Sequence, residues 1–248
     1  MFKNTKLLLS YLSFFLLCAT LTHMSILSAY ASQTVQELDS AQLAETLQNT
    51  YSKLTSLEFN FTQVTRTGGR ERHGAGNAVF YRSTLSPEKN VQTNSVMRWN
   101  YTSPDEQIIT NDGETLSIYT KKDQQILMTP ANELESDITF AFLSGSKKLL
   151  DDFLATKPND RFSFSIPGKD IRGLQLIPRT PHSQVKAIHM WFDDTFVIHN
   201  LIIEDHFDSV TELIFTNILL DKIPADNPRK VQEILHFPIP AGTEIISQ

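Results

Sequence analysis

The stretch AVFYR, residues 78–82, places a charged side chain beside apolar ones. If it forms a strand, the alternation of side chains sends Ala78, Phe80 and Arg82 to the same face. The guanidinium of Arg82 has five N–H donors, so the chemistry that it could do there is to hydrogen-bond carbonyl oxygens. A buried cation without a partner would be costly. The alternative is that the strand ends at Tyr81 and that Arg82 is solvated.

No other group of reactive side chains has the spacing of a catalytic or metal site. The six histidines after residue 31 include no HExxH pair and no other close metal set. There is no GxSxG nucleophile motif, and SGSKK at 144–148 lacks the spacing of a P-loop. GAGNAV at 74–79 precedes a predicted strand instead of a helix, which argues against a dinucleotide site. We therefore predict no catalytic residue, no metal, no cofactor and no enzymatic activity.

Composition and charge restrict the class of protein. The chain has 248 residues, of which 40% are hydrophobic, enough for a substantial core. Its formal net charge of -6 argues against a nucleic-acid partner, because binding to phosphates requires a basic face. An acidic, soluble protein is the simpler interpretation.

Residues 1–31 have the pattern of a cleavable signal peptide. Lys3 and Lys6 precede a long apolar run, and the sequence from Ala29 to Ala31 supplies small residues for a signal peptidase. We predict cleavage after Ala31. A membrane anchor that is retained is the alternative, although polar residues interrupt the run.

Cleavage would leave residues 32–248, which we predict to form a single domain. The leader contains two lysines and no acidic residue, so its removal changes the formal net charge from -6 to -8. Cys18, the only cysteine, lies in the leader and follows a leucine, so we expect neither a disulfide nor a lipid-attachment site. We expect a monomer that is free in solution, in the periplasm if the signal is bacterial.

One helix and a long hairpin are the first elements expected to position Arg82. An apolar stripe at helical spacing indicates the helix, which Asp39 or Ser40 could cap: Leu43, Leu47, Tyr51 and Leu54. LEFNFTQV at 57–64 and NAVFYR at 77–82 alternate as strands. The segment RTGGRERHGAG at 66–76 is predicted to be the turn between them.

Most of the remaining chain has the pattern of an antiparallel meander. SVMRWNY at 95–101 puts Met97, Trp99 and Tyr101 on one face, and Asp112-Gly113 marks a tight turn within QIITNDGETLSIY. Further strands are predicted at 161–166, 172–178, 184–192, 196–205, 210–220 and 236–246. The segment 132–153 reads instead as one or two short helices that could cover the mouth of the sheet.

Several motifs resemble one family. FYR at 80–82 and RWNYTSPDEQIITNDGETLSIY at 98–119 follow FNFTQ and precede TFAFLSG and FPIPAGTEII. In this order they are similar to the LolA family, the periplasmic carriers of lipoproteins. The stretch STLSPEKNVQTNS at 83–95 departs from the family because it is longer.

The resemblance implies a mainly β (α+β) fold: an unclosed antiparallel β-barrel with a concave apolar cavity, covered by short helices. It further implies that the cavity holds the acyl chains of lipoproteins. Its partners would be acylated lipoproteins, an inner-membrane ABC transporter that releases them and an outer-membrane receptor. A periplasmic protein of the same fold that senses lipids or lipoproteins is the alternative.

Within this fold, the residues expected to line the cavity come from the predicted strands: Leu57, Phe59, Phe61, Ala78, Phe80, Met97, Trp99, Ile109 and Leu116. Phe140, Phe142 and Leu143 would belong to the lid. In the family, the arginine that matches Arg82 is linked with lid closure, so Arg82 would bond carbonyls at the end of a lid helix and act as its latch. The alternative for each apolar residue is ordinary core packing, because apolar alternation is first a signal of a core.

Overall fold

The computed structural model describes residues 38–82, 95–131, 143, 149–181, 185–225 and 227–247. The chain divides into two compact units, Met1–Leu38 and Asp39–Gln248, and of the first only Leu38 is described. The fold below is therefore that of the second unit. The predicted signal peptide lies outside the described residues. Within them, every helix is too short or too polar to cross a membrane.

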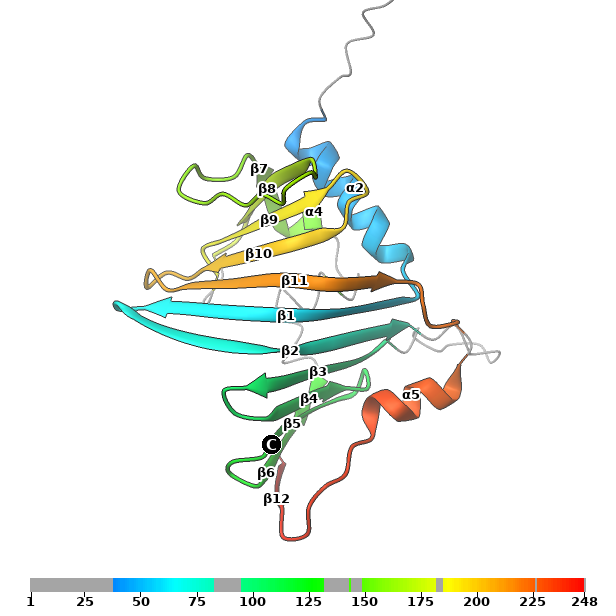
Figure 1. Ribbon diagram of the computed structural model, residues 1–248. Helices are drawn as coiled ribbons and strands as arrows, with labels where there is room; N and C mark the ends of the chain where they lie inside the picture. Colours follow the sequence, from blue (N-terminus) through cyan, green and yellow to red (C-terminus); the bar gives the residue numbers. More distant parts are fainter. Residues whose placement is uncertain are drawn as a thin grey trace, which may run out of the picture. The chain divides into compact units, whose positions relative to one another are not determined.

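Twelve strands in the described residues form one sheet (Figure 1). Their order in the sheet is β12-β6-β5-β4-β3-β2-β1-β11-β10-β9-β8-β7, and neighbours are antiparallel except β12, which runs parallel to β6. The sheet ends at β12 and β7, so it is unclosed, and the predicted fold class is confirmed. The strands are β1 (Ser56–Thr67), β2 (Arg70–Arg82), β3 (Ser95–Ser103), β4 (Gln107–Asn111), β5 (Thr115–Thr120), β6 (Gln125–Pro130), β7 (Phe153–Thr156), β8 (Ile171–Pro178), β9 (Ala187–Asp193), β10 (Ile198–Glu204), β11 (Val210–Leu220) and β12 (Glu244–Ser247).

The hairpin of β1 and β2 is longer than predicted. Its turn consists of Gly68 and Gly69 alone, both with positive φ, which suits glycine and matches the twist of paired strands. The expected turn at 66–76 was therefore too wide, because most of its residues pair across the hairpin, from Arg66 with Glu71 to Phe61 with Gly76.

The inner face of the sheet, which we define as the face that carries Phe59 and Phe80, is set by strand register. Leu57 lies opposite Phe80, which lies opposite Met97. Ala78 likewise lies between Phe59 and Trp99. The alternation predicted from the sequence is confirmed for these residues, which share this face across β1, β2 and β3.

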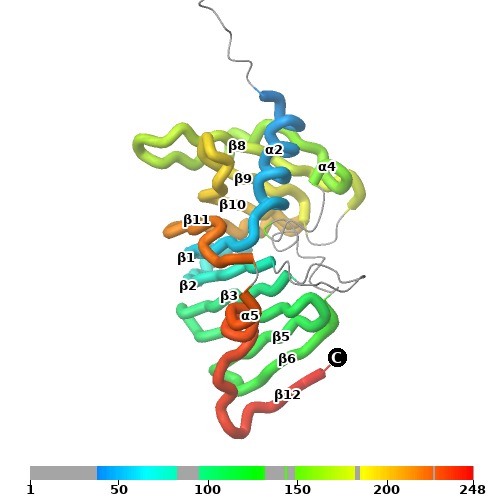
Figure 2. Tube along the Cα trace, turned by 90° about the vertical axis from the view of Figure 1, so that its right-hand side faces the viewer, coloured from blue at the N-terminus to red at the C-terminus, as the bar shows by residue number. Residues whose placement is uncertain are grey.

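Helix α2 (Ser40–Lys53) lies against the inner face. Asp39 is its N-cap and forms a capping box with Gln42, as the sequence suggested for one of two candidates. Its buried side chains are Ala44, Leu47 and Tyr51. It contacts α4 (Leu149–Asp152), β7 and β8, and Figure 2 shows it running from these elements towards the start of β1.

The opposite, outer face is covered by two segments that the sequence did not reveal as covers. Helix α5 (Pro228–Leu235) packs against β3 and β4, with Ile234 buried beside Tyr81 and Val96. Asn227 caps this helix and Pro228 begins it, two signals that would have allowed its prediction. Near the other edge, the irregular segment 157–170 places Phe162 against His189 of β9.

Two predicted strands need correction, and two observed strands were missed. Residues 161–166 form no strand, because Phe162 and Arg161 engage the outer face of β9 and β10 instead of extending the sheet. Of the segment 236–246 only the end is a strand, since Pro238 and Pro240 cannot donate to a ladder. The short strands β6 and β7 were not predicted, and β7 begins at Phe153, within the segment read as helical.

Candidate functional site

The inner face carries a continuous group of aromatic side chains. Phe59 lies 4.6 Å from Phe215 and 5.5 Å from Trp99, measured between ring centroids. Phe61 lies 4.6 Å from Trp99 and 5.0 Å from Tyr101. These rings come from β1, β3 and β11, so packing on the inner face joins strands from both sides of β1.

The structure places all nine predicted lining residues on this face. Seven belong to one buried cluster together with Ala44, Leu47 and Tyr51 of α2: Leu57, Phe59, Phe61, Ala78, Phe80, Met97 and Trp99. Ile109 is half-buried and packs against that cluster, and Leu116 is buried. In this form the side chains of the protein itself therefore occupy the inner face, with α2 among them.

Within the part of the chain that the structure describes, two buried polar atoms of the inner face have no hydrogen-bond partner: Trp99 Nε1 and Thr129 Oγ1. Thr129 lies opposite Leu116 in the pairing of β5 and β6, which puts it on this face. Buried polar groups in a permanent core are usually paired, because an unpaired donor costs roughly 1–3 kcal/mol. Among the described residues, Trp99 Nε1 and Thr129 Oγ1 are thus polar atoms of the inner face that are buried without a hydrogen bond.

Arg82 lies at the end of β2, on the same face as Phe80 and opposite Ser95 of β3. Its backbone N–H donates to Thr55 O at 2.8 Å. Its Nη1 donates to Ser52 O, a carbonyl in the last turn of α2, where the helix dipole favours a cation. The side chain is half-buried, and burial lowers the pKa of the guanidinium. The strand thus includes Arg82, and among the described residues its side chain donates to a carbonyl of α2. Most of the segment 132–153 proposed as the lid lies outside the described residues, so a contact of Arg82 with that segment stays a prediction.

A small cavity adjoins this contact. Its volume is about 20 Å³, enough for about one water molecule. It lies where the end of α2, the start of β1 and the end of β2 meet, and its lining includes Tyr51, Leu57, Phe80, Arg82 and Leu143. Packing is therefore incomplete beside the contact of Arg82 with α2.

Of the three predicted lid residues, only Leu143 is described. Its side chain is 3% exposed, belongs to the inner-face cluster and lines the small cavity. Phe140 and Phe142 lie outside the described residues, so their role stays a prediction.

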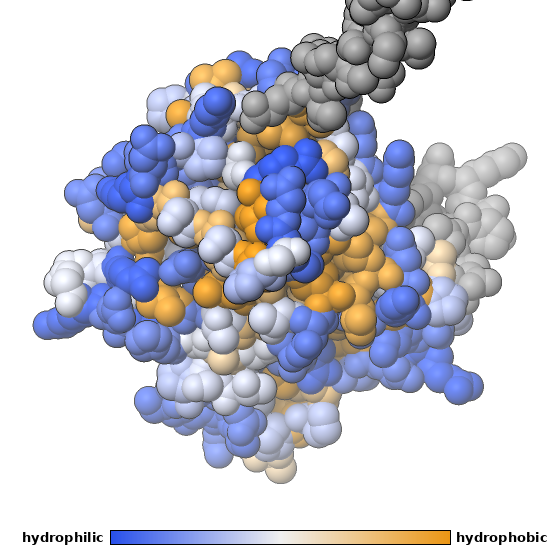
Figure 3. Space-filling model, turned by 45° about the horizontal axis from the view of Figure 1, so that its top comes forward, coloured by the Kyte–Doolittle hydropathy of each residue, from blue (hydrophilic) through white to orange (hydrophobic). Residues whose placement is uncertain are grey.

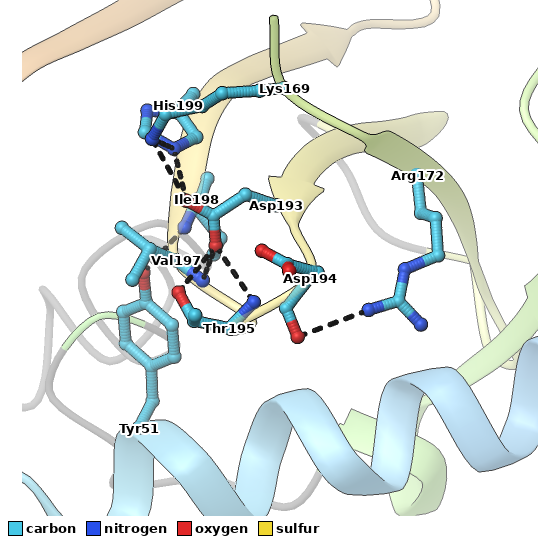
Figure 4. A network of polar contacts seen from close by, with 9 residues as sticks. All are labelled: Tyr51, Lys169, Arg172, Asp193, Asp194, Thr195, Val197, Ile198 and His199. Atoms are coloured by element: carbon cyan, nitrogen blue, oxygen red, sulfur yellow. Dashed lines mark hydrogen bonds and ion pairs between the residues drawn. The ribbon is translucent and has the colours of Figure 1, made fainter.

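A polar network that the sequence did not reveal meets the end of α2 (Figure 4). The Tyr51 hydroxyl accepts a hydrogen bond from Ile198 N–H at 3.0 Å. Burial raises the pKa of the Tyr51 phenol well above its usual value, and Asp193 adds to the rise, so the phenol stays neutral. Tyr51 therefore joins α2 to the turn between β9 and β10.

Asp193 organises that turn. One carboxylate oxygen accepts from Thr195 N, Thr195 Oγ1 and Val197 N at 3.1, 2.6 and 3.1 Å. The other lies 2.8 Å from His199 Nε2 and 3.1 Å from Lys169 Nζ. Burial opposes ionisation of Asp193, but the hydrogen bonds from His199, Thr195 and Lys169 outweigh it and hold its pKa well below the ordinary value.

A second polar group lies on the outer face. His189, which is fully buried, places Nε2 2.7 Å from Glu204 Oε1, and Arg161 pairs with the other oxygen of Glu204. Burial lowers the pKa of His189, against the effect of Glu204. Among the described residues, no three His, Cys, Asp or Glu side chains are grouped so that they could hold a metal ion.

Comparison with known proteins shows which family the sequence of this chain matches. The family model described as outer membrane lipoprotein carrier protein LolA matches residues 52–227. A protein of Nitrosomonas europaea called outer-membrane lipoprotein carrier protein is 24% identical over 212 residues, 83% of this chain and 89% of that protein. A protein of the same name from Cupriavidus taiwanensis is 25% identical over 226 residues, 91% of this chain and 97% of that protein.

A solved structure has a fold similar to that of this chain. The crystal structure of an uncharacterized conserved protein from Thermus thermophilus matches with a TM-score of 0.50 at 8% sequence identity, over 85% of this chain and all of that one. The match of the family model extends from the last turn of α2 to the start of α5, and thus includes Arg82 and the strands of the inner face. The chain belongs to the LolA family of outer membrane lipoprotein carrier proteins.

Proposed function

We propose that the protein carries lipoproteins by sheltering their acyl chains between α2 and the inner face of the sheet. The observation that supports this most is the contact of Arg82 with Ser52 O, which holds the end of α2 against the apolar inner face. The names of the relatives, outer-membrane lipoprotein carrier protein, point to the same cargo.

The need for such a shelter follows from the cost of exposing an acyl chain. A chain of about fifteen methylenes in water costs on the order of 12 kcal/mol, at ~0.8 kcal/mol per CH₂. Binding must therefore move α2 or its neighbours, because the inner-face side chains are buried by the protein itself in this form. In the open form those apolar side chains contact the cargo instead of one another.

Arg82 is proposed as the latch of the empty form. Its guanidinium donates to a helix carbonyl beside the small cavity, so entering acyl chains would displace the helix and break that bond. Because the bond forms only in the closed form, it favours release of cargo. Leu143, which lines the same cavity, is the one of the three proposed lid residues that the structure describes.

The proposed setting is the periplasm, after cleavage of residues 1–31. An inner-membrane ABC transporter would supply the lipoprotein and an outer-membrane receptor would accept it. The carrier itself would break no covalent bond, so transfer would follow differences in affinity, with each ~1.4 kcal/mol shifting the partition tenfold. Fractionation of expressing bacteria and N-terminal sequencing of the exported protein test this, with Ser32 expected as the first residue.

Mass spectrometry of the gently purified protein tests the cargo. We expect acylated lipoprotein, or acyl chains from it, in the material isolated from the periplasm. A protein that neither contains such lipid nor takes up a fluorophore-labelled dipalmitoyl peptide would contradict the proposed function.

Substitution Arg82→Leu tests the latch. The change removes the donors to Ser52 O, so the closed form is weakened. Cargo should then leave roughly ten- to a hundred-fold more slowly, as expected for a charge-assisted bond of ~1.5–3 kcal/mol. The rate is measured as transfer of the labelled peptide to acceptor vesicles. Arg98→Leu is the matched control, because Arg98 is also half-buried but bonds His236 O on the outer face. Equal transfer rates in both variants and the unaltered protein would rule out the latch.

A further inference from the structure

The last turn of α2 is held from two sides. On one side Arg82 of β2 donates to Ser52 O. On the other, the Tyr51 hydroxyl accepts from Ile198 N–H at the start of β10. Loss of the Arg82 contact alone therefore leaves α2 attached through Tyr51.

The hydrogen bond between Tyr51 and Ile198 is less exposed to solvent than the one between Arg82 and Ser52. Tyr51 is 3% exposed and Ile198 is 1% exposed, whereas Arg82 is half-buried. A hydrogen bond in such a site is expensive to break, because its buried donor would lose its partner without gaining water. Contact with Tyr51 is thus a constraint on α2 separate from the Arg82 contact.

The turn that presents Ile198 is itself fixed. Asp193 accepts three hydrogen bonds from Thr195 and Val197, and Val197 directly precedes Ile198 (Figure 4). His199, which directly follows, bonds the other carboxylate oxygen. Ile198 N–H is therefore oriented by ordered residues on both sides.

A third contact joins α2 to α4 and to strands near the β7 edge of the sheet. Gln48, one turn before Tyr51, accepts a hydrogen bond from Leu149 N of α4 at 2.5 Å, and α2 packs against β7 and β8. Tyr51 and Gln48 thus join α2 to elements on the β7 side of the sheet, whereas Arg82 joins it to β2.

We propose that Tyr51 is a second positioning residue of the carrier: its hydroxyl locks α2 to the β9–β10 turn, and this lock must also open, or move with α2, before cargo enters. This inference rests on the proposed function, but the lock itself is a property of the empty protein. It assigns Asp193 the role of holding Ile198 N–H in place for Tyr51.

Hydrogen exchange of the empty full chain tests the lock without any cargo. In Tyr51→Phe, which keeps the ring and removes only the hydroxyl, the amides of residues 44–54 should exchange about tenfold faster than in the unaltered protein. Tyr101→Phe is the matched control, because Tyr101 also lies at the inner face but its hydroxyl bonds Gln63 of β1 instead of the β9–β10 turn. Asp193→Asn should accelerate the same amides, and the double variant should add little to either single change.

Uptake of the labelled dipalmitoyl peptide then links the lock to function. Tyr51→Phe should bind the peptide several-fold more tightly, since less free energy is needed to open the empty form. Unchanged exchange of α2 in Tyr51→Phe, or the same acceleration in Tyr101→Phe, overturns the lock. Faster exchange of α2 with unchanged peptide affinity overturns its role in the carrier. Failure of every variant and of the unaltered protein to bind the peptide instead contradicts the proposed function, while the exchange result still decides whether the lock exists.

Discussion

At the scale of single residues, the packing of the inner face depends on a glycine, Gly76. Gly76 lies opposite Phe61 in the hairpin, at a register shift between β2 and β3. A Cβ at Gly76 would lie 1.8 Å from Asn100 O and 3.0 Å from Phe61 Cζ. Glycine therefore allows the β3 backbone to approach and leaves room for the Phe61 ring, which contacts Trp99.

Gly76→Ala should destabilise the protein by about 3 kcal/mol, because the added methyl meets backbone that cannot rotate away. The measurement is the free energy of unfolding in urea. Gly74→Ala is the control, since the nearest atoms to its Cβ would belong to side chains: Tyr101 at 3.3 Å, which can adjust, and Gln63 at an ordinary contact distance of 3.7 Å. Equal losses in the two variants would show that the backbone approach at Gly76 has no special role.

The residue scale also shows what the sequence could reveal about the site. The alternation of Phe59, Phe80 and Trp99 was enough to place them on one face, because side-chain direction in a strand has a period of two. The partner of Tyr51 was not predictable, since Ile198 N–H lies 147 residues further along the chain and a backbone donor leaves no mark in the sequence. For Arg82 the expected acceptor was a carbonyl at the end of a lid helix, and among the described residues the acceptor is Ser52 O in the last turn of α2.

At the scale of elements, α2 is fixed at both its start and its end by side-chain hydrogen bonds. Its first turn is closed by Asp39, whose side chain accepts from Gln42 N at 2.8 Å, while Gln42 Oε1 accepts from Asp39 N at 3.0 Å. Its last turn bears Tyr51 and Ser52. A helix of this length gains stability mainly from its packed face, so its cap adds a small, separable term.

Asp39→Ala should lower the free energy of unfolding by about 1 kcal/mol, because the first turn of α2 loses an acceptor. Asp39→Asn should be nearly silent, since asparagine caps as well as aspartate. Urea denaturation followed by circular dichroism measures both. A loss in Asp39→Asn that equals the loss in Asp39→Ala would show that the charge, not the cap, is what matters.

Elements that the sequence missed share a physical cause. RFSFSI alternates as a strand would, yet Phe162 covers His189 and Arg161 pairs with Glu204, so tertiary contacts decided its path. Parallel pairing of β12 with β6 joins segments that are far apart in the sequence, which local pattern cannot foresee. Strong local signals, such as the capped apolar stripe of α2, were sufficient for the elements that they mark.

At the scale of the whole molecule, the two faces of the sheet are closed by different means. On the inner face α2 packs into the apolar cluster and is also held by hydrogen bonds in its last two turns. On the outer face α5 and the segment 157–170 pack over Tyr81 and His189. Hydrophobic side chains also reach the surface among hydrophilic ones (Figure 3), and Phe207 is 83% exposed. Such exposed residues are usual in soluble proteins, so they add no argument for a second apolar site.

The buried His189 makes the stability of the molecule depend on pH. Its pKa in the folded protein lies below the ordinary 6.5, chiefly because burial disfavours the charged ring, although Glu204 favours it. His189 therefore takes up a proton near pH 6.5 in the unfolded chain, but only at a lower pH in the folded protein. Because the unfolded chain then binds more protons, the free energy of unfolding falls as the pH drops through 6.5. Well above pH 6.5, His189 is neutral in both the folded and the unfolded protein, so there it no longer makes stability depend on pH.

The free energy of unfolding should thus decrease between pH 7.5 and pH 5.5, by at most about 1.4 kcal/mol per pH unit from this group. His189→Gln keeps a donor for Glu204 but does not titrate, so its stability should vary less with pH over the same interval. Urea titrations of both proteins at several pH values measure the difference in slope. Parallel slopes would contradict the assignment, because they would mean that His189 takes up its proton equally well in the folded and the unfolded protein.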